Sequence, residues 1–547
     1  VTSGTSVPYW KTQGEGLSSR LTDEKDMRPI GLALLDSDLR DGQRVQVEIR
    51  GAKIDALIVP YNLRSEAPPF ARAILYGPES PADQPVSAPA ASKVHSLLKM
   101  AKDNTVWRQT KCVNLIPSEM TPSRMSRLLS IMDPAGRYAE HKEVTALDFD
   151  VFYYQGTDFI EQVEAALVRE MSEYLGCSEV EARVVSGQMA NATVFSAMLD
   201  HINRGDRRAE PRRIRCVLNN HIMKGGHLSA QPMGALKDFV ARDPITEKAA
   251  VVNFPVLADN PYKIDVNATR EVLDASRPEL IIFGKSMVLH PEPIAEIRRF
   301  LDDMKIDAVV MYDMAHVLGL VGPYFQEPFK EGADIVTGST HKTFFGTQRG
   351  VIAGNFAKDQ DGYHLWEAVR RRTFPGAVSN HHLGTMLGLL MSAYEMNYFK
   401  RDYQRKVLAN AKAFAKALKD AGLDVAGDTS VSFTETHQVI VNVGYGKGPE
   451  IARLLEDNNI IVNYQASPAE EGFTASGSLR LGVSEMTRFG MEEGDFAKLA
   501  QLIHDVIVHG QSVKDKVESL RRGFLDMKFC FTSREFNEAM KQLHKLV

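Results

Sequence analysis

A regular alternation of short apolar runs and helical stretches over residues 93–374 is the feature that most restricts the fold of this chain. Each run is three to five residues long and apolar on both faces, which is typical of strands in a parallel sheet covered by helices. The runs lie at 216–218, 251–254, 280–283, 308–312, 335–338 and 351–353. The sequence therefore predicts an α/β fold with a mainly parallel sheet, in which ligands bind at the carboxyl ends of the strands.

Regions of different character flank this domain. In residues 1–76 polar and apolar residues alternate at 44–50, and a second apolar run follows at 56–59, which predicts a small β module. Residues 77–92 are rich in Pro, Ala and Ser and predict a linker. Residues 375–547 begin with a long helical segment and continue with strand–helix–strand units. They predict a second, smaller α/β domain.

Composition excludes several classes of function. The 547 residues are 44% hydrophobic and carry a formal net charge of -5, which gives no electrostatic reason to expect nucleic acid or an anionic membrane as a partner. The four cysteines lack paired spacing, and no apolar run is long enough to span a bilayer. We expect a cytoplasmic protein that acts on a small molecule. No metal site is expected, because the histidines, His381 and His382 included, lack a convincing ligand spacing.

Two residues at strand ends carry the strongest chemical signal. Lys342 follows the apolar run at 335–338, and Asp313 ends the run at 308–312. A lysine amine becomes a nucleophile when burial and nearby cations lower its pKa. Pyridoxal phosphate needs such a lysine for its aldehyde and an acidic group for its ring nitrogen. Taken singly, Asp313 could cap a helix and Lys342 could be solvated; the pair favours the cofactor.

Other residues carry weaker signals. Ser186, Gly187 and Gln188 open a helical stretch whose N-terminus could bind a phosphate, although a serine there is also an ordinary N-cap. Arg480 lies in a strand-like stretch, where it could be salt-bridged or could clamp a substrate carboxylate. The second role would make the substrate an α-amino acid.

Eight short motifs together resemble one enzyme family. In the order of that family the chain contains Tyr-Ala-Glu at 138–140, Tyr-Tyr-x-Gly at 153–156, Ser-Gly-x-x-Ala-Asn at 186–191, Gly-Gly-His-Leu at 225–228, Asp-Met-Ala-His at 313–316, Thr-His-Lys-Thr at 340–343, Phe-Pro-Gly at 374–376 and Leu-Arg-Leu-Gly at 479–482. From about Leu97 to Asp526 the chain resembles the serine hydroxymethyltransferases. The resemblance implies fold type I of the pyridoxal phosphate enzymes and a homodimer with shared active sites.

The resemblance also assigns roles to individual residues. It implies that Lys342 forms the Schiff base, that Asp313 pairs with the ring nitrogen, and that Ser118 and Arg480 hold the substrate carboxylate. Ser286, His316, Thr340 and His341 would surround the ring and the lysine. The phosphate would be held by Ser186, Gly187 and Gln188, with Gly376 from the partner subunit.

The remaining roles concern the reaction itself. Glu140 would move protons, and Tyr138 and Tyr154 would reach in from the neighbouring subunit. The implied activity is the reversible cleavage of serine to glycine, with transfer of the one-carbon unit to tetrahydrofolate.

The chain departs from the family pattern near the expected ring, phosphate and pterin. Lys224 stands where the family has a ring-stacking histidine, Gln188 replaces a serine, and Gln465 replaces an asparagine often used for folate. Residues 141–152 replace a stretch that contains Gly and Pro. These changes leave Schiff-base chemistry in place and keep open a folate-independent aldolase or transaldolase. A non-catalytic scaffold is the third alternative.

The front module has its own resemblance. Val-Thr-Ser-Gly at 1–4, Arg-Pro-Ile-Gly-Leu-Ala at 28–33 and the run that ends at Gly51 resemble the C-terminal barrel of glycine-cleavage aminomethyltransferases. We expect a docking or packing element there.

Overall fold

The structure is a computed structural model and describes residues 3–13, 20–32, 39, 43–49, 51–58, 90–144, 149–205, 208–360, 362–470 and 476–547. Two antiparallel hairpins lie at the front of the chain: β1 (Ser3–Gln13) pairs with β2 (Arg20–Leu32), and β3 (Arg44–Ile49) pairs with β4 (Ala52–Leu57). The strand predicted at 56–59 begins earlier, directly after the turn at Gly51. The β character is confirmed, while closure into a barrel stays a prediction. Most of the linker predicted at 77–92 lies outside the described residues, and its last three residues already belong to α1 (Ala90–Thr110).

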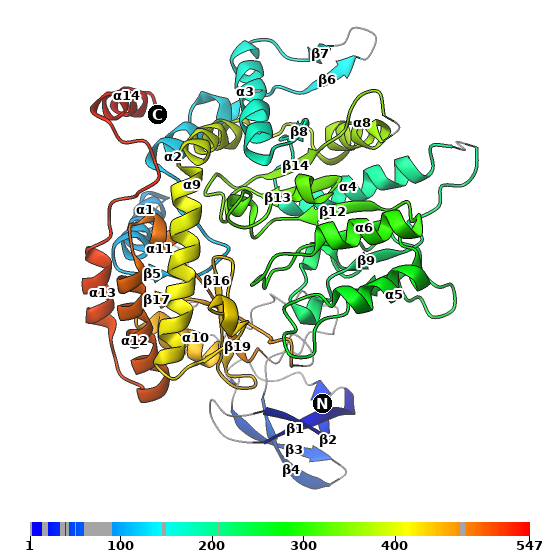
Figure 1. The fold of residues 1–547 in the computed structure, drawn as a ribbon. Helices are drawn as coiled ribbons and strands as arrows, with labels where there is room; N and C mark the ends of the chain where they lie inside the picture. Colours follow the sequence, from blue (N-terminus) through cyan, green and yellow to red (C-terminus); the bar gives the residue numbers. More distant parts are fainter. Residues whose placement is uncertain are drawn as a thin grey trace.

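A seven-stranded sheet forms the centre of the molecule (Figure 1). Its strands in spatial order are β10 (Val251–Asn253), β9 (Val217–Asn219), β11 (Leu280–Phe283), β12 (Val309–Asp313), β13 (Ile335–Ser339), β14 (Gly350–Gly354) and β8 (Glu179–Glu181). The first five are mutually parallel, and β14 runs antiparallel to both of its neighbours. The mainly parallel sheet predicted from the sequence is confirmed.

Helices cover both faces of this sheet because alternate strand residues point to opposite sides. Leu280 and Ile282 pack with residues of α4 (Gly187–Ile202) and α8 (Tyr363–Arg371). Ile281 and Phe283 belong to a larger core that also contains side chains of α3 (Asp158–Leu175), α5 (Val266–Ser276) and α6 (Ile294–Met304). Because both faces of the sheet are buried, the strands appear in the sequence as continuous apolar runs.

The 38-residue helix α9 (Leu383–Asp420) runs beside the sheet domain and leads into a smaller α/β region (Figure 1). There the antiparallel strands lie in the order β15 (Asp424–Val425), β16 (Gln438–Asn442), β19 (Ser478–Gly482) and β18 (Asn463–Gln465). The second α/β region is thus present as predicted. A parallel pair that the sequence did not reveal joins β17 (Ile460–Ile461) to β5 (Val113–Asn114).

Further helices and strands lie in the described part of the chain. They are α2 (Arg124–Ser130), the hairpin of β6 (His141–Val144) and β7 (Phe149–Phe152), α7 (Pro328–Glu331), α10 (Gly448–Asp457), α11 (Ser484–Arg488), α12 (Glu493–His509), α13 (Lys514–Arg522) and α14 (Arg534–His544). Among the described helices, none is both long and apolar enough to cross a membrane.

Candidate active site

Asp313 ends strand β12 and its carboxylate is surrounded by donors. Its Oδ2 accepts hydrogen bonds from Asn191 Nδ2 at 2.7 Å and Ser229 Oγ at 3.1 Å, and it also contacts His227 Nδ1. Burial raises the pKa of this carboxyl, but His227 and the hydrogen bonds outweigh burial and lower it to about 2. Asp313 is therefore a fixed anion at the carboxyl edge of the sheet, where such sheets bind ligands.

Lys342 follows the neighbouring strand β13, in a loop held by threonine hydroxyls. Thr340 Oγ1 donates to the backbone oxygen of Thr347 at 2.7 Å, and Thr343 Oγ1 donates to the backbone oxygen of His316 at 3.1 Å. The pKa of the Lys342 amine is lowered to about 8 by burial and by Arg480, against the opposing effect of Asp313. A substantial fraction of this amine is neutral near pH 8, as a nucleophilic lysine requires.

Two histidines lie beside the lysine and are uncharged. His316 Nε2 is 3.3 Å from Lys342 Nζ, and burial together with the lysine charge lowers the pKa of His316 well below its ordinary value. The same two causes lower the pKa of His341 to about 4. The Nδ1 atoms of both rings are buried without a hydrogen-bond partner. Both rings can therefore offer a hydrogen bond without adding charge.

Arg480 on β19 brings a guanidinium from the second α/β region to the same place. Its Nη1 donates to the backbone oxygen of Ser286 at 2.7 Å, while its Nε is buried without a partner. Burial alone lowers its pKa to about 10, so it stays charged at neutral pH. Among the described residues, no carboxylate pairs with it. An almost fully buried cation of this kind calls for an anionic ligand.

The loop that contains Ser118 runs beside this arginine. The backbone N–H of Gly482, on the strand of Arg480, donates to Leu115 at 2.7 Å, and a Cβ at Gly482 would lie 2.5 Å from the Cα of Pro117. His437 is also buried here, with its pKa lowered to about 3 by burial and by Arg480. The sequence did not single out His437, because a histidine at the start of a strand carries no chemical signal.

The N-terminus of α4 lies directly against β13. Ser186 caps this helix by accepting from the Met189 N–H at 3.1 Å, so the ordinary N-cap role is present. A Cβ at Gly187 would lie only 2.3 Å from Ser339 Oγ, which explains the glycine. Gln188 is exposed in the first turn of the helix. The capped N-terminus still leaves backbone N–H groups available for an anion.

Two of the departures from the family pattern connect the two α/β regions. Lys224 Nζ donates to the backbone oxygen of Pro468, and Gln465 Nε2 donates to Ser286 Oγ at 3.3 Å. Ser286 Oγ itself lies 3.3 Å from the backbone oxygen of Gly225. The lysine and the glutamine thus hold the second region against the loops around Ser286.

A second group of predicted residues lies on another surface. The rings of Tyr138 and Tyr154 are in contact, with centroids 5.2 Å apart, and are 51% and 41% exposed. The pKa of Tyr154 is raised by partial desolvation and by nearby Glu140. Gly376 is exposed in the turn before α9. Among the described contacts, none joins Tyr138, Glu140 or Tyr154 to Lys342.

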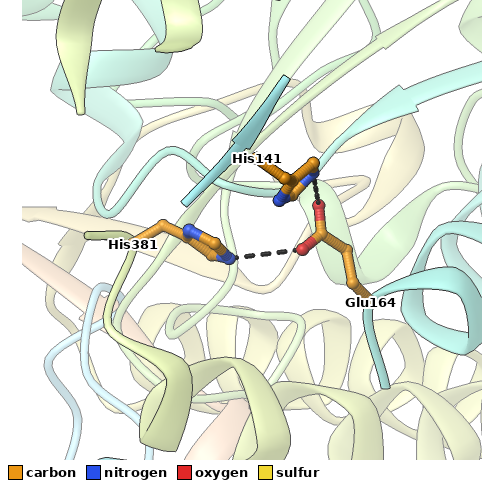
Figure 2. A group of neighbouring side chains, drawn as sticks. All are labelled: His141, Glu164 and His381. Atoms are coloured by element: carbon orange, nitrogen blue, oxygen red, sulfur yellow. Dashed lines mark ion pairs between the residues drawn. The ribbon is translucent and has the colours of Figure 1, made fainter. Parts of the chain in front are cut away.

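Beneath this surface lies a buried cluster that the sequence did not predict. Figure 2 shows Glu164 of α3 between His141 and His381, with each imidazole Nε2 3.2 Å from one carboxylate oxygen. The three ligand atoms lie within 4.8 Å of one another, a spacing compatible with a metal ion. The residues are far apart along the chain, and so no sequence spacing could have indicated their proximity.

The buried residues around Asp313 and Lys342 fit pyridoxal phosphate. Asp313 offers a fixed negative charge, Lys342 a partly neutral amine, and α4 a helix N-terminus. Unpartnered polar atoms at Arg480, His316 and His341 are buried in the same place, as a polar ligand would require. These groups lie at or just beyond the carboxyl ends of β12 and β13, or face them from α4 and β19.

Comparison with known proteins agrees with this chemistry. Residues 92–503 match the family model described as serine hydroxymethyltransferase. The chain is 38% identical over 452 residues to a serine hydroxymethyltransferase of Pyrobaculum calidifontis, an alignment that covers 82% of this chain and 97% of the relative. It is 35% identical over 446 residues to that of Staphylothermus marinus, covering 80% and 93%.

A solved structure with a related fold adds a second comparison. An L-threonine transaldolase from Pseudomonas fluorescens, in its internal aldimine state, is 26% identical with a TM-score of 0.70, covering 83% of this chain and 97% of that one. The fold is thus that of the type I pyridoxal phosphate enzymes, as the motifs implied. By the extent of the family match and of the alignments, the chain belongs to the serine hydroxymethyltransferase family.

Proposed function

We propose that this protein interconverts serine and glycine and transfers the one-carbon unit to tetrahydrofolate. The observation that carries the proposal is the meeting of a fixed anion at Asp313, a partly neutral amine at Lys342 and an unpaired buried guanidinium at Arg480. Pyridoxal phosphate supplies, when bound, an aldehyde for the lysine and a ring that accepts electrons from the bond that breaks. The protein supplies position and charge.

Lys342 and Asp313 would hold the two ends of the cofactor ring. The amine of Lys342 is the nucleophile for the aldehyde, and the neighbouring His316 is neutral and leaves its Nδ1 available. The Asp313 carboxylate is ionised at all physiological pH values and would keep a proton on the ring nitrogen. Ser186, Gly187 and Gln188 at the start of α4 would hold the phosphate.

Arg480 would hold the carboxylate of the amino acid. A planar guanidinium can bind a carboxylate through two parallel hydrogen bonds, which fixes its orientation. Ser118, in the loop beside β19, would add a hydroxyl. A fixed carboxylate decides which bond at Cα stands perpendicular to the cofactor ring and is therefore weakened. The substrate class is thus a small amino acid with a hydroxyl at Cβ.

Glu140, Tyr138 and Tyr154 would act in the site of a second subunit. Within one chain Tyr138 and Tyr154 are exposed, Glu140 is half-buried and Gly376 lies in an exposed turn, and large exposed aromatic side chains favour an interface. Glu140 would hold or release a proton at the substrate hydroxyl or the folate, and Gly376 would approach the partner's phosphate. This proposal requires a homodimer.

The cellular location and the domain boundaries follow from the same features. We propose action in the cytoplasm, a cofactor domain over residues 93–374, a smaller domain over residues 375–547 and a front module over residues 1–76. The two hairpins of the front module and the continuous sheet of the cofactor domain support this division.

The direct test is an assay of purified protein with serine, with and without tetrahydrofolate. We expect folate-dependent formation of glycine and a yellow protein that loses its colour in Lys342→Ala. Equal glycine formation in the two assays would exclude the folate step. A colourless native protein that cannot take up pyridoxal phosphate would instead favour a scaffold.

A folate-independent aldolase or transaldolase is the second candidate. It is favoured by Gln465, which replaces the asparagine used for folate and is engaged with Ser286 Oγ at 3.3 Å. The similar solved structure is an L-threonine transaldolase. If threonine with an added aldehyde yields a new β-hydroxy amino acid faster than serine yields glycine, this candidate replaces the first.

A further inference from the structure

Glu164 of α3 lies between two buried imidazoles, His141 at the start of β6 and His381 directly before α9. These three residues are here called the histidine cluster (Figure 2). Each Nε2 is 3.2 Å from one oxygen of the carboxylate, and one ligand atom of each residue lies within 4.8 Å of the others. Ligands bound at about 2.0–2.1 Å to one tetrahedral ion are roughly 3.3 Å apart. The cluster therefore has nearly the spacing of ligands around a single metal ion.

Three polar atoms of the cluster are buried without a hydrogen-bond partner. They are Glu164 Oε2 and both ring nitrogens of His381. The Nε2 of His381 is only 3.2 Å from Glu164 Oε2, but the two atoms are not aligned for a hydrogen bond. Two polar atoms that lie this close without bonding each other can both bind a third atom. Since buried polar atoms in folded proteins rarely lack a partner, the pair calls for a ligand.

The hydrogen bonds of His141 leave a lone pair on its Nε2. The Nδ1 atom lies 3.1 Å from the backbone oxygen of Ala139, which can only accept, so Nδ1 carries the proton. Arg183 Nη1, which can only donate, is 3.4 Å from Nε2. The lone pair also faces a Glu164 oxygen at 3.2 Å, and a cation bound to both atoms removes their repulsion. A neutral imidazole whose Nδ1–H is fixed by a carbonyl is the form in which histidine binds metals.

Two nearby guanidinium groups oppose a cation, but both are engaged elsewhere. Arg183 binds Glu181 through Nε at 2.9 Å and Nη2 at 2.6 Å, and its Nη1 has another acceptor in the backbone oxygen of His141 at 3.3 Å. Arg349 donates to the backbone oxygen of His381 at 2.7 Å. Glu181 and the carboxylate of the cluster balance these two positive charges. A zinc-bound water has a pKa of about 7, so hydroxide at an open position offsets part of the added charge.

We propose that the histidine cluster binds one zinc ion, with His141 Nε2, His381 Nε2 and the Glu164 carboxylate as ligands and water or hydroxide in the fourth position. Two imidazole nitrogens and one carboxylate suit zinc. Calcium and magnesium prefer a shell made of oxygen atoms alone. The site does not depend on the proposed function.

The ion joins parts of the chain that no shared sheet connects. Among the described strands, β6 and β7 pair only with each other. His141 is the first residue of this hairpin, and Glu164 belongs to α3, whose apolar side chains lie in the main core. Metal bonds from one carboxylate to the two imidazoles therefore fasten the hairpin and the segment before α9 to that core. Zinc should stabilise the folded protein, because the unfolded chain does not hold the three ligands together.

The test measures the zinc content of the purified full-length protein by elemental analysis, after incubation with zinc sulfate and desalting. We expect about one zinc ion per chain in wild type, and at most about a tenth of that in Glu164→Gln and in His381→Asn. X-ray absorption at the zinc edge should show nitrogen and oxygen neighbours at about 2.0–2.1 Å and no sulfur. Wild type that retains no zinc would overturn the proposal.

Control variants separate this site from zinc bound elsewhere. His504, Asp505 and His509 of α12 form a less buried group of possible ligands, and His382 is an exposed neighbour of the cluster. His504→Asn and His382→Asn should keep the full zinc content. If Glu164→Gln and His381→Asn retain as much zinc as wild type, the ion is adventitious and the proposal is wrong.

Thermal unfolding gives a second readout. Zinc added to metal-free protein should raise the Tm of wild type and of His504→Asn by about 2 to 5 °C, and should leave the Tm of His381→Asn unchanged. Each variant is compared with itself, with and without zinc, so a loss of stability caused by the substitution does not affect the result. An equal rise in wild type and His381→Asn would contradict the proposal. Neither measurement requires activity, so failure of the proposed function would leave both unaffected.

Discussion

Lys342, Asp313 and Arg480 are surrounded by their own chain, whereas Tyr138 and Tyr154 present 51% and 41% of their surface to solvent. Asp313 and Lys342 lie where two parallel strands end, and Arg480 lies within strand β19, so sheet backbones set the geometry of this group. The two tyrosines flank the two-stranded hairpin of β6 and β7, which pairs with none of the larger sheets among the described residues. One chain thus supplies most of the proposed cofactor-binding groups, whereas the proposed proton-transfer groups face outward.

The contrast also appears in the charges. The Asp313 carboxylate accepts hydrogen bonds from Asn191 and Ser229, whereas the Nε of Arg480 is buried without an acceptor. A carboxylate ligand at Arg480 would remove this imbalance. In the region of the tyrosines, by contrast, the Glu164 carboxylate already lies 3.2 Å from both His141 and His381. The first region thus fits a small charged molecule, and the second would meet a protein surface in the proposed homodimer.

Removal of the nucleophile should have the largest effect and tests whether the buried group is the reactive one. Lys342→Ala should lower the rate of glycine formation by roughly 10³-fold or more and abolish the cofactor absorbance. The exposed Lys237→Ala, in the same domain, should leave both unchanged. Full cofactor colour in Lys342→Ala would mean that another amine binds the aldehyde.

Neutralising the anion should have the next largest effect. Asp313→Asn keeps the shape of the side chain and its contacts with Ser229, but it removes the charge opposite the ring nitrogen. We expect kcat to fall on the order of 100-fold, with the cofactor still bound. Steady-state kinetics together with an absorption spectrum would measure both. Unchanged kcat would show that the ring nitrogen does not depend on Asp313.

Replacing the guanidinium tests whether the buried cation binds substrate. Arg480→Lys keeps the charge but cannot form two parallel hydrogen bonds, so KM for serine should rise about 10- to 100-fold. The colour of the protein should remain. A rise in KM that is equal for serine and for an amine without a carboxylate would show that Arg480 acts on the fold and not on the carboxylate.

The sheet and the buried residues were predictable because one-dimensional patterns determine them. The strand predicted at 280–283 coincides with β11, since an apolar run between polar residues has only one way to be buried on both faces. The two-residue strands β5 and β17 were not predicted, because two residues show no periodicity. The contacts of Asp313 with Asn191 and Ser229 depend on how α4 and the short helical turn at Ser229 pack against β12, and residue order does not specify that.

The acidity of Lys342 provides a further test of the buried region. The pKa of Lys342 is about 8, so its neutral fraction rises as the pH increases through that value. The rate at which cofactor-free protein takes up pyridoxal phosphate should increase about tenfold between pH 7 and pH 9. Stopped-flow absorbance would measure this rate. An uptake rate that does not change with pH would mean that the protonation state of Lys342 does not limit the reaction.

Mixed dimers test the proposed division between the two regions directly. Lys342→Ala subunits lack the nucleophile, and Glu140→Gln subunits lack the proton carrier, so each homodimer should be nearly inactive. If Glu140 serves the partner's site, a hybrid dimer contains one intact site with Lys342 from one subunit and Glu140 from the other. Random reassociation makes half of the dimers hybrid, and mixing should therefore restore about one quarter of wild-type activity.

The same mixture would reveal a site completed within one chain. In that case each site of the hybrid keeps one defect, because the alanine and the glutamine stay with their own subunits, and mixing restores nothing. A mixture of Lys342→Ala with Asp313→Asn is the matched control. Asp313 ends β12 and Lys342 follows the adjacent strand β13, so no arrangement of subunits can combine the intact pair, and activity should not rise above that of the separate variants.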